Sequence, residues 1–110
     1  MHRVSYAGEK FLVADAAIVA LLDFAIVIAD AGQAQPIVIP TVTDDGRPSL
    51  VRSTIGPASQ IVAVPIDDGA HDPDVHDFVE EISDRAKRYM RGRGIPEEIT
   101  DRVLHEDYPD

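Results

Sequence analysis

The side chains with the greatest capacity for chemistry lie between Asp67 and Asp77, where two histidines and five aspartates fall within eleven residues. Imidazole and carboxylate groups can hold Zn²⁺, Mn²⁺ or Ni²⁺, and His71, Asp72 and His76 are the candidate ligands. Their spacing fits no established ligand pattern, and the acids and glycine stand at the wrong offsets for an EF-hand loop. We therefore interpret the run as a solvated acidic linker leading into a helix cap, and we expect no metal or cofactor.

Two further residues could do chemistry, Ser59 and Arg52. Ser59 lies in the turn Gly56–Gln60, but the Gly-x-Ser-x-Gly frame of a nucleophile elbow is absent, and turn hydroxyls usually bond local backbone. Arg52 could bind an anion, although pairing with an acid or plain solvent exposure explains it equally simply. The chain has no cysteine, which excludes thiolate chemistry. We therefore predict no catalytic residue, and the sequence leans away from an enzyme.

The element that organises the rest of the chain is its longest apolar run, Asp15–Gly32. Its length favours a helix over a strand, with Asp15 placed to cap the first turn and Gly32 to end the last. At 100° per residue, Asp23 and Asp30 fall in one sector, and large apolar side chains fill the remaining arc. That arc is wider than the apolar stripe of about 100° on an ordinary surface helix. We expect a helix over 15–31 that is covered on more than one side.

The sequence leaves two ways of covering this helix open. It could lie across a sheet with the tail helices on its flank, or a second copy could shelter it in a homodimer seam. A membrane span is disfavoured because Asp23 interrupts the run.

Short β-type segments surround the helix, and Asp45-Gly46 and Gly56-Pro57 mark reversals between them. Pro40 lacks an amide hydrogen and indicates an edge or a bulge in its strand. The fold class that follows is a two-layer α+β fold, with a small antiparallel or mixed sheet of three to five strands packed by helix 15–31. The predicted strands are His2–Tyr6, Phe11–Val13, Pro36–Val42, Ser49–Ile55 and Ser59–Val64.

The C-terminal part is predicted to be helical, at about 73–91 and 96–106. The first of these helices follows Asp72-Pro73 and has a clear apolar stripe at 3–4 spacing. The stripe either packs on the core or docks another protein, and both stay open. We divide the single domain into a compact core, 1–66, and an acidic loop with a helical tail, 67–110. The candidate interaction residues are Phe24, Ile28, Val75, Phe78, Val79, Ile82 and Tyr89.

The net charge of −10 limits the choice of partners. An acidic chain is repelled by nucleic-acid backbones and by anionic membranes, so we expect neither as a direct partner. The start of the chain lacks the apolar core of a signal peptide, and together with the absence of cysteine this suggests a cytoplasmic protein.

Several motifs resemble a group of small uncharacterised actinobacterial proteins. They are the start His2–Gly8, the alanine-rich run Asp15–Ala31, the strand Ile37–Pro40, the turn Asp45-Gly46 and the turn Gly56–Gln60. The resemblance covers about residues 1–66, and its motifs are structural. It implies a bacterial fold unit and no activity.

Three functions follow from these patterns. The leading hypothesis is a non-catalytic protein-interaction or assembly module that self-associates, because the first helix is apolar over so wide an arc. The second is an acidic, antitoxin-like inhibitor or decoy that covers a basic surface of another protein. The third and weakest is a small metal-dependent enzyme that uses His71, His76 and the nearby carboxylates.

Overall fold

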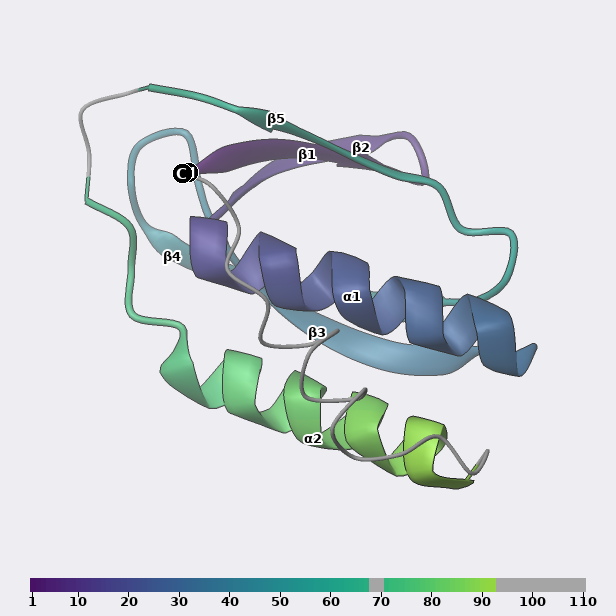
Figure 1. The fold of residues 1–110 in the computed structure, drawn as a ribbon. Helices are drawn as coiled ribbons and strands as arrows, with labels where there is room; N and C mark the ends of the chain where they lie inside the picture. Colours follow the sequence, from purple (N-terminus) through teal and green to yellow (C-terminus); the bar gives the residue numbers. More distant parts are fainter. Residues whose placement is uncertain (68–70, 93–110) are drawn as a thin grey trace.

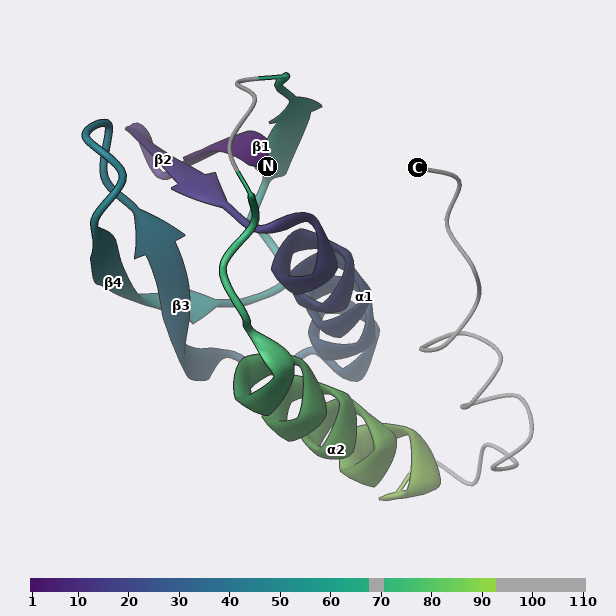
Figure 2. The same cartoon turned by 90° about the vertical axis from the view of Figure 1, so that its left-hand side faces the viewer.

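The computed structural model describes residues 1–67 and 71–92. Its strands form one antiparallel sheet, α1 lies against the concave side of that sheet, and α2 packs beside α1 (Figure 1, Figure 2). This confirms the predicted α+β fold, whereas the predicted helix at 96–106 lies outside the described residues. The elements are β1 (His2–Tyr6), β2 (Glu9–Val13), α1 (Asp15–Ala31), β3 (Gln35–Val42), β4 (Pro48–Ile55), β5 (Ile61–Pro65) and α2 (His76–Gly92).

The sheet has five strands in the order β4-β3-β2-β1-β5. The β1–β2 hairpin turns through Ala7 and Gly8, which both have positive φ angles, of 53° and 83°. Two consecutive positive φ angles are typical of a type I′ turn, whose twist matches that of the flanking strands. Strand β5 returns to pair with β1, with Val4 opposite Ala63, so the first and last strands are neighbours.

Strands β2 and β3 meet only at one corner, where Leu12 lies opposite Val42. Beyond that corner β3 pairs with β4 alone, over its full length from Gln35 to Val42. Pro40 therefore lies where no β2 residue pairs with β3 and no ladder hydrogen bond to β2 is lost. Pro40 indicates a free strand edge, and the part of β3 that does not pair with β2 has such an edge, although β3 is an internal strand of the sheet.

Helix α1 spans the predicted range and ends as predicted, because Gly32 adopts the left-handed conformation with φ 67° and its N–H bonds the carbonyl of Ala29. Its start differs from the prediction. Ala14 is the N-cap residue and makes no side-chain cap, and the carboxylate of the distant Asp72 accepts the N–H of Asp15 in the first turn. The Asp15 carboxylate instead contacts the N-terminus, because β1 brings Met1 next to the first turn of α1.

Helix α2 begins at His76, three residues later than predicted. The side chain of Asp74 accepts a hydrogen bond from the His76 amide at 3.0 Å, so Asp74 rather than Asp72 serves the helix start. Ile82, Ala86 and Met90 lie on the α2 face that joins the core. Each large side chain buried in this way stabilises the fold by about 1.5–3 kcal/mol before conformational entropy is subtracted.

Two layers cover α1, as its wide apolar arc predicts, and the side left open is the expected one only in part, because Asp30 is exposed but Asp23 is not. Phe24, on the sheet side, is fully buried, and Asp23 is only 5% exposed. Ile26, about 160° around the helix from Phe24, is 65% exposed. A helix that is apolar on most of its circumference carries no clear polar side, so the packing of the sheet and α2 decides which sector meets solvent.

Candidate functional site

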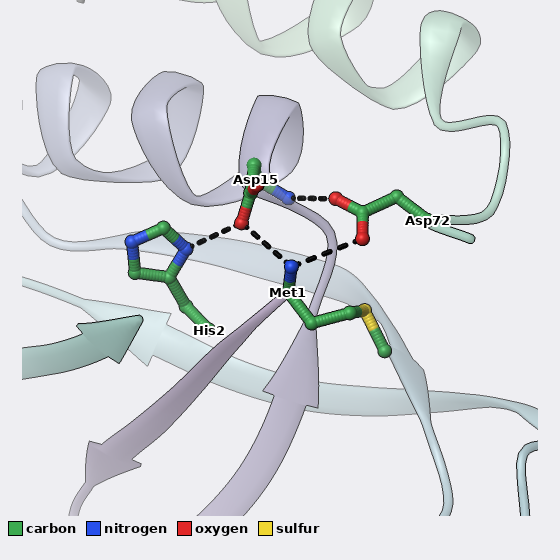
Figure 3. A network of polar contacts seen from close by, with 4 residues as sticks. All are labelled: Met1, His2, Asp15 and Asp72. Atoms are coloured by element: carbon green, nitrogen blue, oxygen red, sulfur yellow. Dashed lines mark hydrogen bonds and ion pairs between the residues drawn. The ribbon is translucent and has the colours of Figure 1, made fainter. Parts of the chain in front are cut away.

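A polar cluster joins the N-terminus, the first turn of α1 and the loop before α2 (Figure 3). The Met1 ammonium donates to the carboxylates of Asp15, at 2.8 Å, and Asp72, at 3.0 Å. Asp72 also accepts the backbone N–H of Asp15 at 2.8 Å. His2 Nδ1 lies 2.7 Å from the same Asp15 oxygen that contacts the ammonium. The cluster thus links three segments that are far apart in the sequence.

The electrostatics of the cluster favour charged forms. Burial alone would lower the pKa of the Met1 ammonium, but its hydrogen bonds to Asp15 and Asp72 outweigh burial and raise the pKa above its usual 8.0. The hydrogen bond from the ammonium likewise lowers the pKa of the Asp15 carboxyl below its usual 3.8, with a smaller contribution from His2. Both pKa shifts mean that the folded chain stabilises the charged forms of the two groups.

The three metal-ligand candidates do not converge. Asp72 is engaged by Met1 and Asp15, whereas His76 Nε2 lies 3.2 Å from Glu80, one turn along α2. His71 is exposed and lies at the rim of a cleft that neither Asp72 nor His76 lines. In the ranges 1–67 and 71–92, no group of three or more histidine, aspartate and glutamate side chains is arranged to hold a metal ion.

Ser59 takes part in local hydrogen bonds, as expected of a turn hydroxyl. Its Oγ accepts the Gly56 amide at 3.0 Å and lies 2.8 Å from the Tyr6 hydroxyl. The Tyr6 hydroxyl also donates to the carbonyl of Thr54. These contacts tie the turn between β4 and β5 to the end of β1, and they give Ser59 a structural task.

A cleft of about 610 Å³ lies where the β3–β4 hairpin leaves β2, next to the segment around Pro73. Leu12, Val42 and Leu50 contribute much of its apolar wall, and Asp74 and His71 lie at its rim. Its volume is within the range of small-molecule pockets, about 300–1,000 Å³.

All seven predicted interaction residues lie in or against the core of the chain itself. Phe24 and Ile28 are fully buried, and Val75 and Ile82 are buried with them. Phe78, Val79 and Tyr89 are partly buried and pack against the same cluster. The apolar stripe of α2 therefore packs on its own core, and two further surfaces are formed by other residues.

One such surface is the side of the sheet that faces away from α1. The strand register places Val64, Arg3, Leu12, Val42 and Pro48 in one row across all five strands. The large apolar side chains Leu50, Val62 and Val64 are 61%, 58% and 53% exposed. We call this surface the sheet face and define it as Arg3, Lys10, Leu12, Val42, Leu50, Arg52, Val62 and Val64.

A second surface runs along the solvent side of α1. Val19, Leu22 and Ile26 follow one another at helical spacing and are exposed or half-buried. Asp15 and Asp30 stand in the same sector at the two ends of the helix. We call these five residues the α1 ridge. Sequence patterns could have found it only by identifying which apolar sector of α1 stays uncovered.

No protein-family model, curated protein or solved structure matches the chain. Among the helices in the described ranges, none is long and apolar enough to cross a membrane.

Proposed function

We propose that this protein is a non-catalytic interaction or assembly module that self-associates. The observation that carries the proposal is the presence of large exposed apolar side chains, Ile26 on α1 and Leu50, Val62 and Val64 on the sheet. Leu50 lies at the β4 edge of the sheet and Val62 and Val64 at the β5 edge, with the half-buried Leu12 and Val42 between them on the same side. An apolar surface of this kind is characteristic of protein-protein contact sites.

The contacts of the polar groups that could do chemistry support a non-catalytic role. Asp72 and Asp15 bind the N-terminus, and Ser59 bonds the backbone of its own turn. A nucleophile or a general base needs a free lone pair directed at a substrate, and these groups direct theirs at the fold.

Sedimentation velocity and light scattering over a wide concentration range test this proposal. We expect the weight-average mass to rise with concentration above that of a 12.0 kDa monomer. A strict monomer at the highest concentration that stays in solution would rule out self-association.

A second candidate function, an acidic inhibitor or decoy, is favoured by the first half of α2. Asp77, Glu80, Glu81 and Asp84 are exposed there, in a chain of net charge −10. A partner with a basic surface would be bound more weakly as salt rises, because exposed charges are screened beyond about 10 Å at 0.1 M ionic strength. A partner whose affinity is insensitive to salt would exclude this function.

A further inference from the structure

We propose that copies of this chain associate head to tail, with the sheet face of one copy seated on the α1 ridge of the next. The inference rests on the proposed self-association and names the two surfaces that meet.

The first argument is charge. The charged side chains of the sheet face are Arg3, Lys10 and Arg52, all exposed, and the strand residues that point to this side include no carboxylate. In the described ranges 1–67 and 71–92, these three cations take part in no ion pair. A surface that is only basic is unusual in a chain with twenty acids and ten bases. A basic surface of this kind is complementary to an acidic surface on a partner.

The α1 ridge has the opposite sign. Its two charged residues are Asp15, whose carboxylate already pairs with the Met1 ammonium, and Asp30, and both are exposed. The neighbouring helix α2 adds exposed acids in its first half, including Asp77 and Glu80, and the exposed base Arg88 in its second half. Two sheet faces placed against each other would bring cations together, and two ridges would bring carboxylates together. A contact between unlike faces pairs the charges.

The second argument is position. Ile26 lies about 160° around α1 from Phe24, which faces the sheet, so the ridge points away from the sheet. The sheet face lies on the far side of the strands, where Figure 2 shows neither helix. Two different complementary surfaces on opposite sides of one molecule form a heterologous contact, which propagates as an open chain or closes as a ring.

The third argument is shape. The cleft of about 610 Å³ is lined by Leu12, Val42 and Leu50 of the sheet face, and Asp44, Asp45 and Asp74 also line it. The Ile26 side chain stands out from α1 and can enter a hollow of this size.

Two single variants test the geometry. Leu50→Glu places a charge on the sheet face and leaves the ridge intact, and Ile26→Glu does the reverse. Both side chains are more than 60% exposed, so the fold should persist, as circular dichroism would verify. We expect each variant alone to associate at least tenfold more weakly than the parent chain in sedimentation velocity.

Mixing the two variants is the decisive measurement. Each copy retains one intact surface, and these surfaces are complementary. An equimolar mixture should therefore form a 1:1 heterodimer that grows no further, while the parent chain forms larger species. Gln60→Glu and Gln33→Glu, which add the same charge outside both surfaces, should associate like the parent chain. Val62→Glu replaces Leu50→Glu if the latter fails to fold.

The failures of the two proposals are distinguishable. If the parent chain is a monomer, self-association itself fails. If the parent chain associates but the mixture stays as weakly associated as each variant alone, the head-to-tail contact is overturned and self-association stands. Charge reversal at Arg3 and Arg52 together should also weaken association, and unchanged association would contradict the charge argument.

Discussion

The guanidinium carbon of Arg85 lies 4.9 Å from the centroid of the Phe24 ring, so a cation on α2 covers the largest core side chain of α1. The same guanidinium donates to the carbonyl of Pro36 at 2.9 Å. The i,i+4 spacing suggests that Arg85 pairs with Glu81 within α2. In the structure it instead joins α2, α1 and the start of β3.

We expect Arg85→Ala to lower the free energy of unfolding by about 1–2 kcal/mol, because it removes a cation–π contact and a charge-assisted hydrogen bond. Thermal unfolding should report a decrease of roughly 4–8 °C per kcal/mol. Arg88→Ala, which removes an exposed arginine from the same helix, is the matched control. Equal effects of the two substitutions would show that the contact with Phe24 contributes nothing.

The docking of α2 predicts a large effect at Ile82, which is 2% exposed. Ile82→Ala should destabilise the chain by about 2–5 kcal/mol, through lost burial and the cavity left behind. Leu50→Ala removes an aliphatic side chain from the exposed sheet face, and its effect in dilute monomer should stay within about 0.5 kcal/mol. Denaturant unfolding measures both. A negligible effect at Ile82 would mean that α2 does not pack on the core in solution.

The Asp15 carboxyl predicts a dependence of stability on pH. Its pKa is lower in the folded chain than the usual 3.8, because the Met1 ammonium hydrogen-bonds it. The stabilisation is therefore complete above the unfolded-state pKa and is lost as pH falls through the lower folded-state pKa. The carboxyl is 59% exposed, so solvent screening keeps the effect small, at most about 1 kcal/mol.

Denaturant unfolding between pH 7 and pH 2.5 checks this dependence. The stability difference between the parent chain and Asp15→Asn should be constant near neutral pH and should shrink below about pH 4. Asp44→Asn, at an exposed carboxylate in the turn between β3 and β4, serves as a control. A difference that grows as pH falls would contradict the assigned direction.

The β1–β2 turn offers a stabilising substitution. Ala7 has φ 53°, a conformation that costs an alanine about 1 kcal/mol and that asparagine tolerates better. Ala7→Asn should raise the free energy of unfolding by up to about 1 kcal/mol, observed as a higher melting temperature. Ala58→Asn, in a turn where alanine has no positive φ, should give no gain. A lower melting temperature for Ala7→Asn would exclude the turn assignment.

The sequence by itself determined the elements of this fold. The length of the apolar run and the glycine that follows it set α1 at 15–31, because one left-handed residue ends a helix locally. Turn residues such as Asp45-Gly46 separate the strands, and 3–4 spacing marks α2. Each of these signals acts within a few residues of the chain, so it can be read without knowing what lies opposite.

The tertiary structure alone decided which surfaces are covered. Asp23 is buried and Ile26 is exposed, against the order that their polarity suggests, because the sheet and α2 occupy fixed sectors around α1. From the sequence, the apolar stripe of α2 could pack either on the core of its own chain or on a partner protein. In the structure it packs on the core. The cluster of Met1, Asp15 and Asp72 joins residues up to 71 positions apart. Periodicity predicts which side chains have to be buried, whereas only the packing of distant segments determines which element buries them.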